Sequence, residues 1–189
     1  MDKIDAKNLT GKCLVSLPDA AGEFAEAVVY ICSHGTDGAM GFIVNKRVKE
    51  FSFRDLAAEL PFPMESDTTA PISLYHGGPL EQAKGFILHS GDYRLPGSLD
   101  TGSGIMVSSS FEVLQDIAAG AGPKQKIIAL GYAGWAPHQL ETEIAENKWL
   151  IAEATPELVL GGDDDRKWSQ AMSSLGISFT NLSPAAGHS

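Results

Sequence analysis

Long hydrophobic runs are missing from this sequence, which argues against a membrane protein. No stretch approaches the ~18 consecutive apolar residues that a membrane-spanning helix needs. The charged residues 1–7 also lack the apolar core of a signal peptide. Cysteine is scarce as well: Cys13 and Cys32 are too few for a disulfide framework or a zinc site. Both lie in apolar runs, where a thiol packs as a small hydrophobic side chain. We therefore expect a cytoplasmic protein with no membrane partner.

Positive charge is also in short supply. The chain has 14 Lys and Arg against 24 Asp and Glu, for a net charge of −10. Proteins that bind nucleic acid through its phosphates present clustered basic residues. The longest basic cluster here, at 46–49, is followed directly by Glu50. Long-range repulsion disfavours direct DNA binding, and the acidity is expected to serve solubility.

The overall composition is that of an ordinary globular protein. Hydrophobic residues make up 43% and charged residues 20% of the 189 positions. A chain of this length buries roughly 70% of its unfolded surface, so it needs no metal or disulfide to fold. We predict one domain over 1–189, with flexible ends at 1–10 and 183–189. The segment 61–71 is expected to be a flexible crossing or a boundary between two lobes.

Strand patterns dominate the first two thirds of the chain. The β-branched and aromatic runs at 27–32 and 40–44 are joined by a short, glycine-rich link. Parallel neighbours need a dozen or more connecting residues, so these two runs are expected to pair antiparallel. Further strands are predicted at 72–75, 85–89, 104–107 and 126–131. Their irregular spacing favours an α+β fold over a regular doubly wound sheet.

About four helices are expected between and after these strands. Ser52 is placed to cap a helix at 53–60, and Ser109 with Glu112 forms a capping-box pattern for a second helix. The third is expected to begin near Pro137, with its polar face turned to water. That face carries Glu141, Glu143 and Glu146. The last helix has apolar side chains at i, i+3, i+4 and i+7, namely Trp168, Ala171, Met172 and Leu175. The acidic residues at 163–165 suit its N-terminus and are expected to form a solvated face, with a divalent-cation site as the alternative.

Several catalytic signatures are absent. The sequence has no Walker loop, no dinucleotide-binding glycine pattern and no Gly-x-Ser-x-Gly elbow. Residues 100–103 spell the Asp-Thr-Gly-Ser motif of aspartic proteases. That chemistry needs two carboxylates that share a proton, and only one copy is present. We interpret this segment as part of a glycine-rich surface loop.

Histidine spacing gives no local metal site. None of the five forms a His-x-His or His-x-x-x-His pair; they are His34, His76, His89, His138 and His188. No metal or cofactor is predicted, although a metal site whose ligands come from separate loops stays open as an alternative. Each histidine is more simply explained by a structural hydrogen bond.

Glycines and histidines gather where strands are predicted to end. Glycine there lets another backbone or a ligand come close. If these ends converge, they form a cleft of imidazole, aromatic rings and bare backbone. The candidate binding surface consists of His34, Asn45, His76, Gly77, Gly78, His89, Gly134 and Trp135. The alternative is that the glycines serve only tight turns and close packing.

Six sequence blocks occur in a recognisable order. They are Gly41-Phe42-Ile43-Val44-Asn45, His76-Gly77-Gly78-Pro79, Gly85-Phe86-Ile87-Leu88-His89, Gly131-Tyr132-Ala133-Gly134-Trp135, Gln139-Leu140-Glu141 and Asn147-Lys148-Trp149-Leu150. Together they resemble the YqgE/AlgH family over roughly residues 11–188. Residues 136–138, Ala-Pro-His, depart from the glycine-containing stretch that is more usual there.

The resemblance implies a bacterial, cytosolic protein. It also implies a mixed, largely antiparallel, coiled or barrel-like sheet with packed helices. One branch of the family is named for transcriptional regulation of alginate synthesis. The resemblance supplies no agreed activity or catalytic residues.

Three hypotheses about function follow. The first is a non-enzymatic regulatory protein that binds a small ligand or an unknown protein partner at the strand ends. The second is a hydrolase with His76 or His89 as general base, hydroxyls from 108–110, and Asn45 as a positioning group. The third is a homo-oligomer built on exposed aromatic residues.

Overall fold

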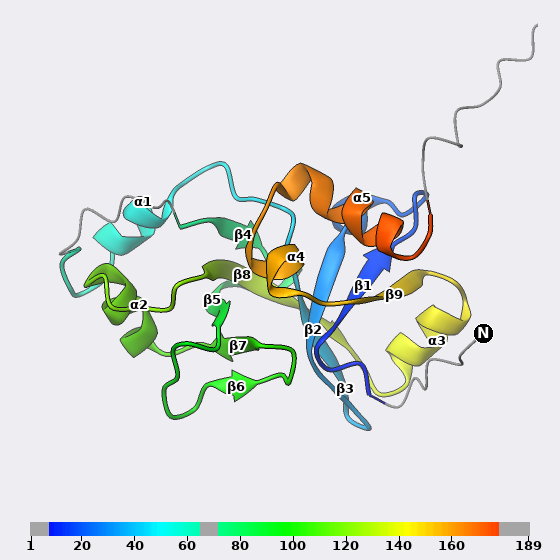
Figure 1. Ribbon diagram of the computed structural model, residues 1–189, viewed down its shortest axis with the longest axis horizontal. Coiled ribbons are helices and arrows are strands. Elements are labelled where there is room, and N and C mark those ends of the chain that lie inside the picture. The colour runs from blue at the N-terminus through cyan, green and yellow to red at the C-terminus, as the bar shows by residue number, and fades with distance from the viewer. Residues whose placement is uncertain (1–7, 65–71, 178–189) are drawn as a thin grey trace, which may run out of the picture.

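A nine-stranded sheet curls on itself in the computed structural model of the chain, which describes residues 8–64 and 72–177 (Figure 1). The neighbouring strands run in the order β6-β7-β5-β8-β3-β2-β1-β9, and β4 pairs with β8. Only the β4–β8 pair is parallel among the strand pairs of the described residues. The α+β fold with a mixed, largely antiparallel sheet is confirmed. The strands are β1 (Lys12–Ser16), β2 (Val28–Gly35), β3 (Gly38–Ile43), β4 (Leu74–His76), β5 (Leu80–Ser90), β6 (Leu99–Asp100), β7 (Ile105–Ser108), β8 (Lys126–Trp135) and β9 (Trp149–Glu153).

The strand β8 joins the two halves of the sheet, one made of β1, β2, β3 and β9 and the other of β4, β5, β6 and β7. Its first part pairs with β4 and β5, whereas 133–135 pair with β3. Between the two parts, Gly131 has a φ of 74°, a left-handed conformation that glycine adopts without steric cost. The strand therefore changes partners at a glycine, and its last residue, Trp135, lies beside β3.

Five helices and one short 3-10 turn complete the described fold. The turn is η1 (Gly22–Phe24), and the helices are α1 (Phe53–Ala58), α2 (Phe111–Ala118), α3 (Gln139–Ala145), α4 (Pro156–Leu160) and α5 (Asp164–Ser174). About four helices were expected from sequence, and α4 was not among them. This helix has only five residues, too few for an apolar period, although Thr155 caps it and Pro156 begins it. None of the described helices has the length and apolar character to span a bilayer.

Two predicted helix starts need correction. Ser110, not Ser109, precedes α2, and its side chain makes no capping hydrogen bond. The helix α3 begins at Gln139 rather than near Pro137, because His138 has a φ of 66° and stands outside the helix as its N-cap. The capping box at Ser52 is confirmed: its hydroxyl accepts from the Asp55 N–H, and the Asp55 carboxylate accepts from the Ser52 N–H.

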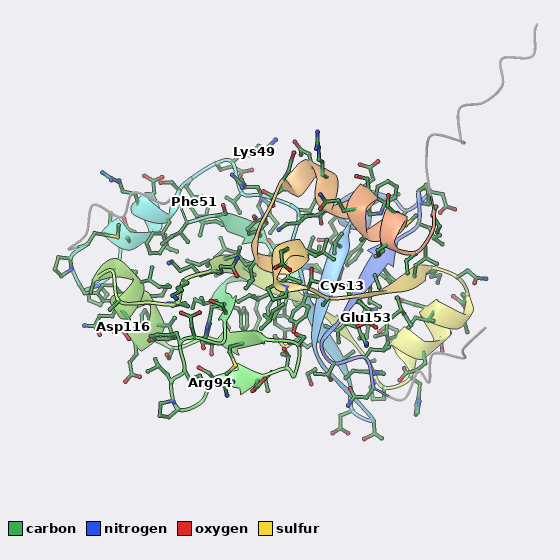
Figure 2. The ribbon with its side chains drawn as sticks, in the orientation of Figure 1. Cys13, Lys49, Phe51, Arg94, Asp116 and Glu153 are labelled. Carbon is green, nitrogen blue, oxygen red and sulfur yellow. The ribbon has the colours of Figure 1, made fainter. Side chains whose placement is uncertain are left out.

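Three apolar clusters fill the described fold. The largest lies inside the curled sheet and is closed by α4 and α5. A second packs α3 against β1, β2, β3 and β9, and a third packs α1 and α2 against β4, β5 and β8. Helices therefore cover the outer faces of both halves of the sheet. Apolar side chains such as Cys13 are buried in the interior, whereas the charged Lys49 and Arg94 are exposed at the outer edge (Figure 2).

Both cysteines are free and buried, in keeping with their predicted role as small apolar side chains. Burial raises the pKa of the Cys13 thiol to about 12 and that of Cys32 to about 11. Both thiols therefore stay protonated near neutral pH, in a form that reacts poorly.

Candidate ligand-binding cleft

The connection from β8 to β9 brings two tryptophans together. Trp135 ends β8, α3 turns back over the sheet, and Trp149 begins β9. The two ring centroids lie 6.2 Å apart with the planes at 77°, an edge-to-face arrangement that aromatic rings favour. Phe24 of the η1 turn adds a third ring, 5.5 Å from Trp149. Three segments distant in sequence thus form one aromatic wall.

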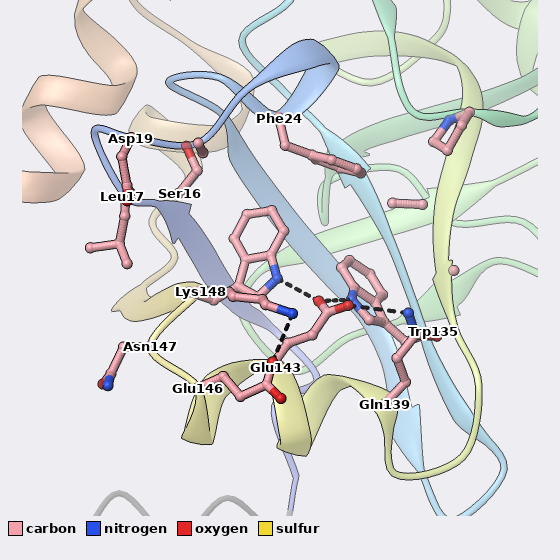
Figure 3. Close-up of a pocket in the computed structure, with 15 residues that line it drawn as sticks. Ser16, Leu17, Asp19, Phe24, Trp135, Gln139, Glu143, Glu146, Asn147 and Lys148 are labelled. Atoms are coloured by element: carbon pink, nitrogen blue, oxygen red, sulfur yellow. Dashed lines mark hydrogen bonds and ion pairs between the residues drawn. The ribbon is translucent and has the colours of Figure 1, made fainter.

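A single carboxylate from α3 holds this wall in place. The Trp135 and Trp149 indole N–H groups donate to the same Glu143 oxygen, Oε2, at 2.9 and 2.8 Å. The Gln139 amide donates to the other oxygen, Oε1, at 3.1 Å. Figure 3 shows Glu143 pointing from α3 toward Trp135 and Gln139. All three donors are neutral groups, so none of these hydrogen bonds pairs the carboxylate with a cation.

These residues line a cavity of about 510 Å³. Its walls come from β1 and the segment after it, from η1, from the end of β8 and from the α3–β9 connection. The lining residues are Ser16, Leu17, Asp19, Ala20, Phe24, Pro79, Ala133, Gly134, Trp135, Gln139, Glu143, Glu146, Asn147, Lys148 and Trp149. We call this cavity the aromatic cleft.

Negative charge exceeds positive charge in the aromatic cleft. Asp19, Glu143 and Glu146 face one ammonium, that of Lys148. Lys148 pairs with Glu146 at 2.7 Å, and both side chains are more than half exposed. This hydrogen bond, together with the charges of Glu146 and Glu143, raises the pKa of Lys148. Lys148 is therefore a charged group at the rim.

The predicted binding surface is divided among several places. Gly134 and Trp135 line the aromatic cleft. Asn45 and His76 line a second hollow of about 700 Å³ between the 45–49 segment and the start of α5, which we call the polar hollow. A smaller hollow of about 340 Å³ contains His76 and Gly78. It lies between the other two along the surface, because it shares His76 with the polar hollow and its lining residue Gly78 adjoins Pro79 of the cleft.

In the polar hollow, the Asp164 carboxylate already has partners within the protein. Asp164 accepts hydrogen bonds from the Tyr75 hydroxyl at 2.7 Å and from Arg47 at 2.8 Å, and it pairs with the buried Lys167 ammonium at 3.2 Å. The expectation that the acidic residues at 163–165 form a solvated face is therefore wrong for Asp164. Among the described residues, no three His, Cys, Asp or Glu side chains lie together as a metal site would require.

Gly77 and Gly78 follow β4, where the chain passes close to the backbone of β8. A Cβ atom on Gly77 would lie 2.3 Å from the Gly131 carbonyl oxygen, and one on Gly78 would lie 2.1 Å from the Tyr132 carbonyl carbon. No side chain fits in either place. Close backbone packing therefore requires both glycines, whatever binds nearby.

His34 holds two segments to the hairpin of β2 and β3. Its Nδ1 accepts from the Leu9 N–H at 3.0 Å, so the proton lies on Nε2, which donates to Glu141 at 2.7 Å. Glu141 was expected to point to water and instead joins α3 to β2. Among the described hollows, none is lined by His34.

His89 lies within hydrogen-bond distance of Ser108, as the hydrolase hypothesis requires. Its Nδ1–H donates to the Ser90 carbonyl at 3.0 Å, and its Nε2 is 2.9 Å from the Ser108 hydroxyl. The Ser98 hydroxyl lies 2.7 Å from the Ser108 hydroxyl. His89 is 0% exposed and Ser108 is 4% exposed, so no substrate reaches the pair in this conformation. His76, the other proposed base, is exposed and lies near Glu50.

Asn45 and the 100–103 segment both have structural roles. The Asn45 side chain accepts from the Val28 N–H and donates to the Glu26 carbonyl, which ties β2 to the residues after β3. In the 100–103 segment, the Thr101 hydroxyl contacts the Tyr30 hydroxyl inside the fold, while Asp100 lies outside and pairs with Arg94 at 3.2 Å. The protease-like motif therefore forms a turn that is anchored to β2.

Most of the aromatic cleft was not predicted from sequence. Trp149 belongs to one of the six resemblance blocks but not to the predicted binding surface, and Phe24 belongs to neither. Glu143 was assigned to the solvent side of α3, which is wrong. The available signal was the presence of two tryptophans on either side of a helix with a glutamate between them, because a buried indole N–H needs an acceptor.

Comparisons with known proteins agree with the fold. A family model described as AlgH-like matches residues 13–180. UPF0301 proteins of Ruegeria pomeroyi and of a Jannaschia species are each 44% identical over 184 residues; the matches cover 96% of this chain and 99% and 95% of theirs. The solution structure of the AlgH protein from Pseudomonas aeruginosa has a TM-score of 0.75 and 32% identity over the whole of both chains. On the family match, the identity and the shared fold, the chain belongs to the AlgH-like family.

Proposed function

We propose that this protein is a non-enzymatic binding protein that holds a small ligand, or a side chain of a partner protein, in the aromatic cleft. The observation that carries the proposal is Glu143, which fixes two indoles and one amide beside an open cavity. A cavity of about 510 Å³ is within the range of small-molecule sites. Because the walls are already held in place, little ordering is needed when a ligand binds.

The proposal uses part of the surface predicted from sequence. Gly134 and Trp135 belong to the ligand site, and Asn45, His76 and Gly78 belong to its neighbourhood. Any regulatory role is exerted through the bound ligand or partner rather than through DNA, because the net charge is −10. The two free, buried thiols suit a reducing cytoplasm.

A thermal-shift screen of metabolites tests the proposal. A ligand at a hundred times its dissociation constant adds about 2.7 kcal/mol, which raises the melting temperature by roughly 5 to 10 °C in a domain of this size. Each hit is then measured on two variants, Phe24→Ala in the cleft and His76→Ala in the polar hollow.

The two variants give opposite expectations. The shift is expected to disappear in Phe24→Ala and to remain in His76→Ala. The reverse pattern would move the site to the polar hollow and contradict the proposal. A hit that survives both variants would place the ligand elsewhere, and a screen without hits would contradict the small-ligand form.

The hydrolase hypothesis rests on one observation, the 2.9 Å contact between His89 and Ser108. A fluorophosphonate probe tests whether this serine becomes accessible and nucleophilic. We expect no labelling, because both groups are buried. Labelling of the wild type that disappears in Ser108→Ala would favour a hydrolase instead.

A further inference from the structure

We infer that the ligand of the aromatic cleft is an organic cation, an alkylammonium or guanidinium group on a hydrocarbon stem. The inference rests on the proposed function and names the chemical class that the cleft selects. The cation is either a free small molecule or a lysine or arginine side chain of a partner protein, since both present the same group.

The Glu143 carboxylate lies inside the cleft without a cationic partner among the described residues. Glu143 receives hydrogen bonds from two indoles and one amide, which are all neutral. Within 8–64 and 72–177, no Lys, Arg or His forms an ion pair with it. The Oε1 oxygen has a single described donor, the Gln139 amide, so it has room for another. A carboxylate in this state attracts a cation and repels an anion.

Aromatic rings stand beside that carboxylate and form one wall of the cleft. Trp135, Trp149 and Phe24 all line the cleft, and tryptophan offers a cation the most favourable ring face. Groups of aromatic rings recognise alkylated ammonium ions in many proteins. The apolar walls also suit a hydrocarbon stem, which a hydrated inorganic ion lacks.

The polar hollow offers no comparable site. With histidine counted as neutral, its lining holds three basic side chains, Lys46, Arg47 and Lys49, and four acidic ones, Glu26, Asp163, Asp164 and Asp165. Arg47 is already paired with Asp164. The cleft has three acidic side chains and one basic one, so the larger excess of negative charge lies there.

Matched probes separate charge from shape. Choline and 3,3-dimethylbutan-1-ol have nearly the same shape, but only choline carries a charge. Two capped pentapeptides of glycine with a central lysine or a central norleucine make the same comparison for a protein side chain. Binding is followed through the indole N–H resonances of Trp135 and Trp149 in ¹H–¹⁵N spectra, with Trp168 as the internal reference.

The charged member of a pair is expected to bind at least about tenfold more tightly than its neutral counterpart, a ratio within the cation–π range. If choline shows this preference, the source is a free cation; if only the lysine peptide shows it, the source is a partner protein. Equal or tighter binding of the neutral probes would overturn the cation class and leave the cleft as a ligand site. Shifts confined to residues outside the cleft would overturn both proposals, and no binding by either cation would overturn the inference alone.

Three variants test whether Glu143 supplies the attraction. Glu143→Gln keeps the size and an acceptor oxygen but removes the charge, and is expected to weaken cation binding by about tenfold. Glu112→Gln, at an exposed position on α2, is the matched control and is expected to bind as the wild type does. Lys148→Ala removes the competing ammonium from the rim and is expected to tighten binding by about two- to threefold. Tighter binding is a gain that a damaged fold does not produce, so unchanged or weaker binding by Lys148→Ala would contradict the inference.

Discussion

At the scale of single residues, the aromatic cleft depends on one carboxylate that satisfies two buried indoles. Trp135 and Trp149 are each 7% exposed, so their N–H groups have little access to water. A buried donor without an acceptor costs about 1–3 kcal/mol. The Glu143 side chain is therefore important for stability as well as for the charge of the cleft.

Glu143→Ala is expected to lower the free energy of unfolding by about 2 to 4 kcal/mol, because it leaves two indole donors without a partner. Glu143→Gln keeps an acceptor oxygen and is expected to lose less than half as much. Urea denaturation followed by fluorescence measures both losses. Glu112→Ala, which removes an exposed helical glutamate, serves as the control and is expected to stay within about 0.5 kcal/mol of the wild type.

His89 is expected to make stability depend on pH. Burial lowers the pKa of this imidazole in the folded protein, so between the folded and unfolded values the unfolded chain binds more protons. Stability is then fully present above the ordinary value of about 6.5 and is lost as the pH falls below it, at up to about 1.4 kcal/mol per pH unit. Urea denaturation at pH 7.5, 6.5 and 5.5 measures this slope.

Two histidine variants separate this effect from other titrations. His89→Gln is expected to show a shallower slope below pH 6.5 than the wild type. His138→Asn changes an exposed histidine and tolerates the left-handed φ of 66° at that position, so it is expected to keep the wild-type slope. An unchanged slope in His89→Gln would show that the His89 imidazole is not responsible.

At the scale of elements, the close approach of the chain after β4 to the backbone of β8 sets the position of the smaller hollow beside the end of β8. The two strands pair in parallel at His76 and Leu130, and the chain then passes closely over Gly131 and Tyr132. The backbone of Ile43 also donates to the Gly77 carbonyl at 2.8 Å. The end of β4 therefore connects β3 and β8 where the two halves of the sheet meet.

Gly78→Ala is expected to destabilise the fold by more than about 3 kcal/mol, or to prevent folding, because its Cβ would collide with the backbone of Tyr132. The control is Gly85→Ala in β5, where the nearest atom would be 3.9 Å away, a normal contact. That variant is expected to stay within about 1 kcal/mol of the wild type. Circular dichroism and urea denaturation of the two variants make the comparison. A well-folded, stable Gly78→Ala would contradict the close approach of Gly78 to the Tyr132 backbone.

At the scale of the whole molecule, net charge decides which large partners approach. With 24 acidic and 14 basic residues, the protein repels polyanions at long range. Basic residues in the polar hollow are balanced by acidic ones, so they form no basic surface of their own.

No sequence-specific DNA complex is expected in gel-shift titrations at about 150 mM salt, where specific binders reach roughly 10⁻⁸ M or tighter. A specific complex in that range would overturn the argument from charge. The same titration with a basic protein of similar size is the positive control for nonspecific binding.

Local sequence patterns predicted the elements that have a local cause. The hairpin of β2 and β3 follows from two apolar runs and a short link, and the start of α1 follows from Ser52 and its capping partner. The apolar spacing of α5 was correctly assigned at Trp168 and Met172, which are buried. Short elements such as α4 gave too few residues for a period and were missed.

The sequence by itself determined the fold class, the family and most strands, because alternation, helical spacing, turn residues and ordered motifs are properties of neighbouring positions. Only the tertiary structure decided the cleft and the polar roles within it. Glu143 meets two indoles, Glu141 meets His34, and Lys167 is buried beside Asp164, yet each occurs in a pattern typical of a solvated helix face. The partners of Glu143 and Glu141 lie on other elements, and the carbonyls that hold Lys167 belong to Val44 and Val159, outside its helix. The local sequence pattern is the same whether a polar helical side chain faces water or a partner on another element. The curled sheet brings those partners close, so the tertiary structure determines which of the two occurs.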